Sequence, residues 1–211
     1  MKRRIGIFLL LIGLLSGCFG GAGKTPFIRQ YVLEYAPPQA AMGTRPVVEE
    51  TVRVERFFAD RMFMGQGMLY RQGPYRRDAY PAQRWRVSPG NMVTEFLRRD
   101  LREAGLFRAV LSERDPEDAR FSVTGGVEQF IESREASGRK ALMTATVTLM
   151  DLSRKETADL VVFQKSYRTE AAIAGEGGAG LAAAMSQAMS DLSRQVIADI
   201  AASLVSKPSA K

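Results

Sequence analysis

Apolar and polar residues alternate over much of the chain, which is the pattern of strands that bury one face. The cleanest example is residues 140–149, where apolar residues from Met143 to Leu149 alternate with threonines. Turn residues such as Gly73-Pro74 separate this segment from others of the same kind. We predict strands at residues 27–35, 47–58, 67–72, 76–85, 106–111, 120–132, 140–149 and 160–169.

Two segments repeat apolar residues every three or four positions, which is the spacing of an amphipathic helix. The first begins with Ser88 as its cap and Pro89 in its first turn, and it ends before Gly105. Its expected core stripe is Met92, Phe96, Leu97, Leu101 and Ala104, and its expected solvent face is Arg98, Arg99, Asp100 and Arg102. The second covers residues 181–205, with a core stripe of Leu181, Met185, Ala188, Leu192, Val196, Ile200 and Leu204.

Glycines modify this pattern in two places. In the strand at 120–132, Gly125-Gly126 indicates either a bulge or a close approach of a neighbouring backbone. The residues of this strand that share one parity and are expected to face the core are Phe121, Val123, Val127 and Ile131. Residues 171–180 are small and glycine-rich, which predicts a mobile loop; an adaptable contact of 175–180 with a partner is the alternative.

The order of strands, helix, strands, helix predicts an α+β fold. We expect a two-layer sandwich: one mixed, mainly antiparallel sheet with two helices on one face. Residues 27–206 would form a single domain, and residues 207–211 a disordered tail.

The start of the chain, KRRIGIFLLLIGLLSGC at residues 2–18, differs from the rest. Basic residues precede an apolar run from Ile5 to Leu15, and small residues follow it, which is the layout of a secretory signal. The run is well short of the about 20 residues that a membrane-spanning helix requires. Residues 1–17 are therefore predicted to be a signal peptide that is removed.

The residues at the end of this signal, Leu15-Ser16-Gly17-Cys18, resemble the bacterial lipobox. That resemblance implies a diacylglycerol on the Cys18 sulfur and an acyl chain on the new amine; a chance cysteine after an ordinary signal is the alternative. Residues 18–26 would then be a lipidated, flexible tether. Two or more acyl chains anchor a protein stably, at about 0.8 kcal/mol per buried methylene. An aspartate directly after the cysteine would resemble an inner-membrane retention signal, so Phe19 at this position favours sorting to the outer membrane.

The composition of the chain limits the kinds of active site that it can form. The chain has 211 residues and a net charge of +7, but it has no histidine and one cysteine, which the anchor would consume. The commonest general base, a thiol nucleophile and a zinc cluster are thus absent, and acidic groups such as Glu49-Glu50 and Asp115/Glu117/Asp118 have no partner that would make them catalytic. Gly23-Lys24-Thr25 imitates a P-loop but lacks the glycine five residues earlier. We predict a binding protein and no enzyme.

Several short motifs follow the lipobox in a recognisable order: Tyr31-Val32-Leu33, Arg53-Val54, Met68-Leu69-Tyr70-Arg71, Tyr80, Arg84-Trp85 and Gly105-Leu106-Phe107. The chain resembles the ABC-type transport auxiliary lipoproteins, the family that includes the paraquat-inducible lipoprotein C. The resemblance implies a periplasm-facing outer-membrane lipoprotein that works with an MCE-type (mammalian cell entry) lipid-transport system. It implies docking on the MCE-domain protein whose rings form a hydrophobic conduit.

Arginine and aromatic residues concentrate between residues 53 and 86. These types are enriched in interface hot spots, so we predict a partner-binding surface formed by Tyr70, Arg71, Tyr80, Arg84 and Trp85. Lipid phosphates are a second target for the arginines, and export argues against nucleic acid. The alternative interpretation is that the aromatics are core and the arginines a solvated rim.

Three methionines, Met62, Met64 and Met68, indicate either core filling or a surface that accepts lipid. The second interpretation leads to another function, a periplasmic carrier that binds phospholipid in its own cavity. A third possibility is an envelope scaffold or activator lipoprotein.

Overall fold

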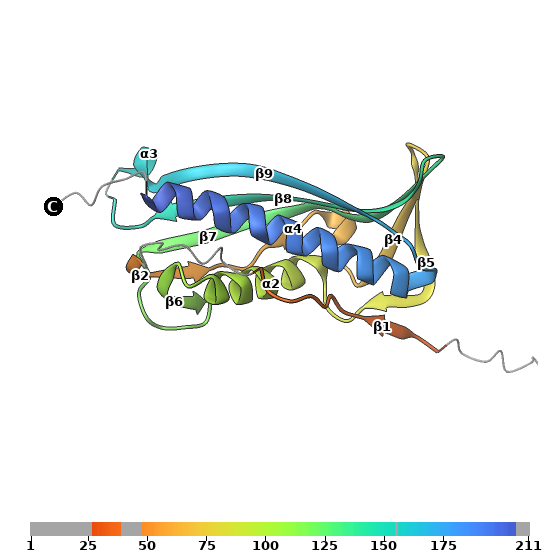
Figure 1. The fold of residues 1–211 in the computed structure, drawn as a ribbon, viewed down its shortest axis with the longest axis horizontal. Helices are drawn as coiled ribbons and strands as arrows, with labels where there is room; N and C mark the ends of the chain where they lie inside the picture. Colours follow the sequence, from red (N-terminus) through yellow and green to blue (C-terminus); the bar gives the residue numbers. More distant parts are fainter. Residues whose placement is uncertain (1–26, 39–47, 155, 206–211) are drawn as a thin grey trace, which may run out of the picture.

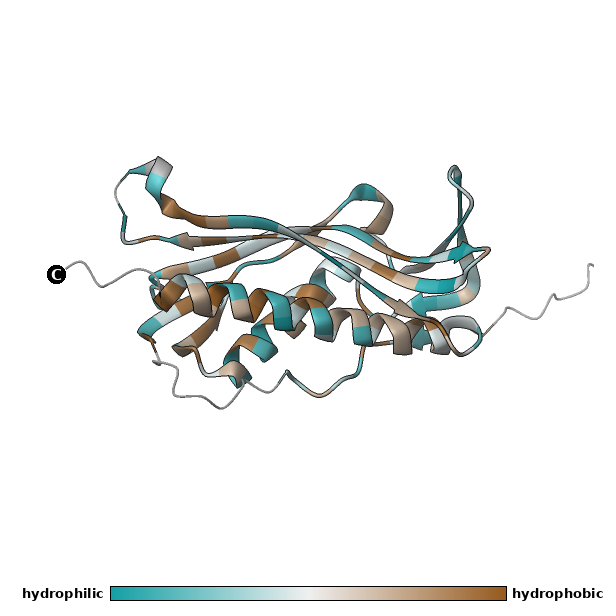
Figure 2. Cartoon of the chain, turned by 45° about the horizontal axis from the view of Figure 1, so that its top comes forward, coloured by the Kyte–Doolittle hydropathy of each residue, from teal (hydrophilic) through white to brown (hydrophobic). Residues whose placement is uncertain are grey.

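The computed structural model describes residues 27–38, 48–154 and 156–205. The predicted signal peptide, Cys18 and its tether, the start of the strand predicted at 47, and the tail at 207–211 lie outside these residues. Within them the chain forms a curled mixed sheet with two long helices, α2 and α4, on one of its faces (Figures 1 and 2). The α+β prediction is confirmed.

The sheet is organised around β7 (Phe121–Glu135). On one side, β7 pairs with β8 (Gly138–Asp151), and β8 pairs with β9 (Val161–Ala172), both antiparallel. On the other side, three short strands line up along β7 in parallel: β2 (Val48–Val54), β3 (Phe58–Ala59) and β4 (Gly67–Gln72). The remaining strands extend this second side, with β5 (Arg76–Trp85) on β4, β6 (Phe107–Ser112) on β2 and β1 (Arg29–Tyr31) on β5. The long ladders are thus antiparallel and most of the short ones parallel.

β7 contains a bulge, but it does not lie at Gly125-Gly126. The register with β8 slips between Val127 and Gln129, so one extra residue inverts the alternation beyond it. Phe130 therefore packs against Trp85 with ring centroids 5.2 Å apart, whereas Ile131 turns to the opposite face. The prediction that Ile131 shares a face with Val127 was wrong for this reason.

Gly125 instead marks a close approach, which was the other interpretation. A Cβ at this position would overlap the carbonyl oxygen of Thr146 on β8 and lie 2.6 Å from Cε1 of Phe57. Phe57 is fully buried, so its ring occupies the space that a side chain on Gly125 would fill.

Helix α2 (Pro89–Ala104) has the predicted ends: Ser88 is the N-cap, and Gly105 ends the helix in the left-handed conformation at φ 63°. One residue was assigned to the wrong face. Asp100 is fully buried, and it accepts hydrogen bonds from Tyr35 Oη at 2.6 Å and from Ser193 Oγ at 2.5 Å. Arg99 pairs with the same carboxylate at 2.7 Å.

Helix α4 (Gly177–Val205) begins inside the segment predicted to be a mobile loop, and β9 continues to Ala172. The loop prediction for 171–180 was therefore too long. Gly178 and Gly180 are buried, and a Cβ on either would overlap a neighbour, the side chain of Gln83 or the carbonyl of Gly175. These glycines permit close packing at the start of the helix.

Three local elements were not predicted as such. The strand predicted at 47–58 divides into β2 and β3, and a 3-10 turn, η2 (Arg61–Phe63), follows β3. A single helical turn, α3 (Thr157–Leu160), lies in the connection that we expected to be a polar turn before β9.

Candidate functional site at the hairpin end

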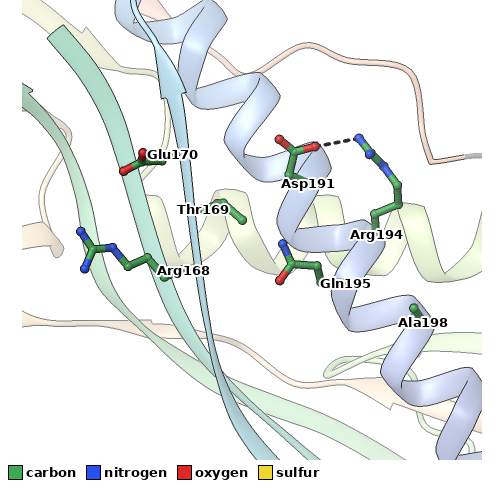
Figure 3. Close-up of a pocket in the computed structure, with 7 residues that line it drawn as sticks. All are labelled: Arg168, Thr169, Glu170, Asp191, Arg194, Gln195 and Ala198. Atoms are coloured by element: carbon green, nitrogen blue, oxygen red, sulfur yellow. Dashed lines mark hydrogen bonds and ion pairs between the residues drawn. The ribbon is translucent and has the colours of Figure 1, made fainter. Parts of the chain in front are cut away.

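A groove of about 540 Å³ lies between β9 and α4 (Figure 3). Most of the residues that line it carry polar or charged groups: Arg194 pairs with Asp191 at 2.8 Å along the helix, and Thr169 points toward α4 and donates to the carbonyl of Ala188 at 2.8 Å. Arg168 and Glu170 point away from the helix on the other side of the strand. This groove offers no apolar chamber for an acyl chain.

Three of the predicted partner-binding residues, Tyr70, Arg71 and Tyr80, belong to the strands that form the end of the sheet where two hairpins are side by side (Figure 1). The β4–β5 hairpin and the β7–β8 hairpin are joined by parallel pairing, with Tyr70 opposite Glu132 and Gln72 opposite Arg134. We call residues 70–80 and 131–141 the hairpin end.

A buried polar cluster lies on the helix side of the hairpin end. Its centre is Glu132, which is fully buried and accepts hydrogen bonds from Arg134 Nε at 2.7 Å, from Arg139 Nε at 2.8 Å and from the hydroxyl of Tyr80. The Arg134 guanidinium also lies 3.6 Å from the ring centroid of Tyr70, which meets Tyr80 edge to face. One carboxylate is thus enclosed by two cations and two aromatic rings.

The surroundings of the cluster lower the pKa of Glu132 and raise the pKa of Tyr80, as expected where the carboxylate is the ionised group. Burial alone would raise the pKa of Glu132, but the hydrogen bonds from Arg139, Arg134 and Tyr80 outweigh it and hold the pKa below its usual value. Burial, and then the hydrogen bond to Glu132, raise the pKa of Tyr80. Glu132 is therefore ionised and Tyr80 neutral near pH 7.

This cluster also connects the hairpins to α4. Arg139 donates to the carbonyl of Gly175 at 3.0 Å, and the backbone N–H of Gly178 donates to Gln83 Oε1 at 2.5 Å. Both contacts cross from the hairpins to the start of the helix, and the first is made by a member of the cluster.

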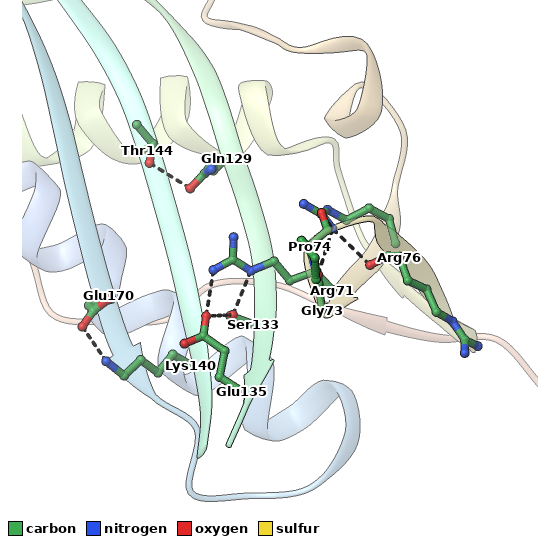
Figure 4. Close-up of polar contacts among 11 residues, drawn as sticks. Arg71, Gly73, Pro74, Arg76, Gln129, Ser133, Glu135, Lys140, Thr144 and Glu170 are labelled. Atoms are coloured by element: carbon green, nitrogen blue, oxygen red, sulfur yellow. Dashed lines mark hydrogen bonds and ion pairs between the residues drawn. The ribbon is translucent and has the colours of Figure 1, made fainter. Parts of the chain in front are cut away.

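The opposite side of the hairpin end faces away from the helices (Figure 4). Here Arg71 donates to Ser133 Oγ at 2.8 Å and to Glu135 Oε1 at 2.9 Å. Lys140 pairs with Glu170 at 2.7 Å on the neighbouring strands. These pairs are partly exposed, so each contributes little to stability, of the order of 0–1 kcal/mol.

Three exposed apolar side chains lie in the segment that follows β2, and one of them, Met62, lies beside Arg71. Phe58 is 71% exposed, Met62 54% and Met64 63%, all within the short stretch that contains β3 and η2. Met62 and Arg71 line one surface cavity of about 190 Å³. We call Phe58, Met62, Met64 and Arg71 the open-face patch.

The structure separates the five predicted partner-binding residues. Trp85 is fully buried and Tyr80 nearly so, which means that neither can contact a partner directly; for them the core interpretation holds. Tyr70 is half-buried beneath Arg134, and Arg84 is half-buried with its guanidinium on the carbonyls of Tyr80 and Gln83 at 2.9 and 2.8 Å. Arg71 lies on the open face, so these residues do not form one surface.

The three methionines divide in the same way. Met68 is buried, as core filling requires, whereas Met62 and Met64 are exposed. The exposure of an aromatic side chain in this region follows from the sequence itself. Phe57 and Phe58 are adjacent in an extended segment, so they must face opposite sides, and one of them had to be exposed. The Glu132 cluster had no such signal, because Tyr80, which closes it, is 52 residues away from Glu132 in sequence.

Among the described residues, no helix combines the length and the apolar character that crossing a bilayer requires. The family model of the ABC-type transport auxiliary lipoprotein component matches residues 31–197. The chain belongs to this family. The auxiliary lipoprotein is thus a component associated with ABC-type transport, as the sequence motifs indicated, and its family fits a lipid-anchored protein of the cell envelope.

Solved structures agree on the fold of this auxiliary lipoprotein. Protein XCC0632 from Xanthomonas campestris matches with a TM-score of 0.71 and 16% identity, over 85% of this chain and 97% of that one. An uncharacterized protein matches with a TM-score of 0.63 and 12% identity, over 83% and 99%. Protein CT253 from Chlamydia trachomatis matches with a TM-score of 0.51 and 10% identity, over 76% and 100%. No curated protein matches the chain.

Proposed function

We propose that this auxiliary lipoprotein is a non-catalytic outer-membrane component of an MCE-type ABC lipid-transport system. It faces the periplasm, is anchored by diacylglycerol and an N-acyl chain on Cys18, and docks on the MCE-domain protein of its transporter. The observation that carries the proposal is the family match over residues 31–197. The lipobox at residues 15–18 supports the anchor.

The non-catalytic part of the proposal rests on composition. The chain has no histidine, and its one cysteine is Cys18. The most strongly organised polar group of the hairpin end, the Glu132 cluster, is closed by its own arginines. An ionised carboxylate between two guanidinium groups is poorly suited to proton transfer near pH 7.

The open-face patch is the surface that we assign to docking. Its apolar side chains are exposed although they lie beside a well-packed sheet, and clustered exposed apolar residues mark interaction sites more often than isolated ones. Methionine and arginine are both enriched at interface cores. Arg71 keeps the role that the sequence predicted for it.

Binding between purified proteins tests the proposal. The lipoprotein in nanodiscs is titrated with the purified MCE-domain protein of the transporter encoded beside it, and binding is followed by biolayer interferometry. Met62→Glu replaces an apolar contact with a charge that loses its hydration in the interface, and it is expected to weaken binding by about tenfold or more. Leu152→Glu is the matched control, because Leu152 is 45% exposed and lies beyond β8, at the other end of the sheet.

Two outcomes would contradict the proposal at different levels. If wild-type protein does not bind the MCE-domain protein, the proposed function is wrong. If it binds and Met62→Glu binds equally well, docking occurs on another surface.

A further inference from the structure

The described chain begins at the same end of the long axis as the two hairpin tips, and α4 ends at the other (Figures 1 and 2). Nine residue steps separate Cys18 from Phe27. An extended chain spans at most about 3.5 Å per residue, so Phe27 lies within about 30 Å of Cys18. An anchor on Cys18 therefore holds the hairpin end near the bilayer.

Large apolar and aromatic side chains are exposed at this end. Phe27 is 84% exposed, Ile28 54% and Tyr75 97%. Tyr75 lies in the turn between β4 and β5, between Gln72 and Arg76. Tyrosine has an apolar ring and a polar hydroxyl, and such rings prefer the boundary between lipid and water.

The turn that carries Tyr75 is held by its own contacts. Gly73 has φ 76°, a value that favours glycine. The Arg77 guanidinium donates to the carbonyls of Gly73 at 3.3 Å and of Pro74 at 3.0 Å. These contacts stabilise the turn that places Tyr75 at the tip of the β4–β5 hairpin.

Charge differs between the two ends of the molecule. The hairpin end, residues 70–80 and 131–141, contains six basic and three acidic residues. The loop before β7 and the segment after β8, residues 113–118 and 151–159, contain seven acidic and three basic residues. An anionic surface attracts basic residues by about 1 kcal/mol each, so it favours approach of the hairpin end and disfavours the other.

We propose that Phe27, Ile28 and Tyr75 form a membrane-contact surface that inserts into the interfacial layer of an anionic bilayer. Arg76, whose side chain is 69% exposed and pairs with Asp78 at 2.6 Å through Nε only, and the exposed Arg29 bind lipid phosphates beside it. The long axis then points away from the membrane, with the acidic end in the aqueous compartment. This inference rests on the proposed anchor at Cys18, and it adds a second, specific contact with the bilayer.

Depth measurements on the full lipoprotein test this surface. Acylation of Cys18 would leave no free thiol in the chain, so Tyr75→Cys places one spin label at the hairpin tip, and Leu152→Cys places a matched label at the other end. Each protein is inserted into phosphatidylcholine vesicles with about 30% phosphatidylglycerol, and the accessibility of the label to oxygen and to a water-soluble nickel complex is compared. We expect the label at 75 to lie at interfacial depth and the label at 152 to lie in water.

Charge is tested in the same assay. Vesicles of phosphatidylcholine alone, or the Arg29→Gln/Arg76→Gln variant in the anionic vesicles, should return the label at 75 toward the aqueous phase.

If the labelled protein floats with anionic vesicles but the label at 75 is as accessible to nickel as the label at 152, the surface does not contact lipid. Dipolar broadening between labels at 75 would show a second copy at this end and overturn the assignment to lipid. Protein that does not float with vesicles lacks the anchor, which overturns the proposed anchor and this inference together.

Discussion

Gly125 is a position where one methyl group decides whether β7, β8 and the Phe57 ring fit together. Gly125→Ala would place a Cβ against the Thr146 carbonyl and 2.6 Å from Phe57 Cε1. We expect a loss of about 2 kcal/mol or more in the free energy of unfolding, measured by urea titration. Gly126→Ala is the control, because its Cβ would have the Phe58 carbonyl oxygen at 3.7 Å as its nearest neighbour. Equal stabilities of the two variants would contradict this packing.

A buried ion pair contributes little net stability, but removing one of its partners is strongly destabilising, and this applies to Glu132. Glu132→Gln leaves the guanidinium groups of Arg134 and Arg139 without their anion, and we expect it to cost about 3 kcal/mol. Tyr80→Phe removes one hydrogen bond to the same carboxylate and should cost about 1–2 kcal/mol. Chemical denaturation measures both. A Glu132→Gln protein as stable as the wild type would mean that the cluster does not hold the hairpins in place.

At the scale of elements, Asp100 joins three segments that are distant in sequence. Its carboxylate accepts hydrogen bonds from Tyr35, in the segment after β1, and from Ser193 of α4. It also pairs with Arg99 of its own helix. Burial, and then the hydrogen bond to Asp100, raise the pKa of Tyr35, so its hydroxyl remains a donor. We expect Asp100→Ala to cost about 3 kcal/mol and Tyr35→Phe about 1 kcal/mol. Limited proteolysis should cut the segment around Tyr35 faster in both variants. Unchanged cleavage would mean that the hydrogen bond to Asp100 does not hold this segment in place.

The elements that local chemistry specifies were predictable. The ends of α2 follow from Ser88-Pro89 and Gly105, and β8 follows from its alternation. The elements that depend on tertiary contacts were not. The bulge after Val127, the burial of Asp100 and the early start of α4 are set by neighbouring strands and by Gln83, which no local pattern contains. For the same reason the sequence did not show that Trp85 is fully buried, and the partner-binding role of Arg71 stays a prediction.

At the scale of the whole molecule, stability should fall in acid. Burial would raise the pKa of Asp151, but hydrogen bonds from Ser153 and Arg120 outweigh it and lower the pKa from 3.8 to about 2. A depressed carboxyl pKa stabilises the fold above the unfolded value and loses that contribution as pH falls through the folded value. The shift corresponds to about 2 kcal/mol, lost between about pH 4 and pH 2.

Asp151→Asn removes this titration. Thermal unfolding as a function of pH should show the variant less stable than the wild type at pH 7, with the difference shrinking below about pH 4. A difference that stays constant down to pH 2 would place the effect on packing and not on the charge of Asp151.

The proposed orientation of the sheet, its open-face patch and the hairpin end depends on the proposed attachment of the chain at Cys18. The intact mass of the protein purified from cell envelopes tests this most directly. We predict a chain that begins at Cys18 and carries the added mass of a diacylglycerol and an acyl group. A chain that begins elsewhere, or an unmodified thiol at Cys18, would contradict the account.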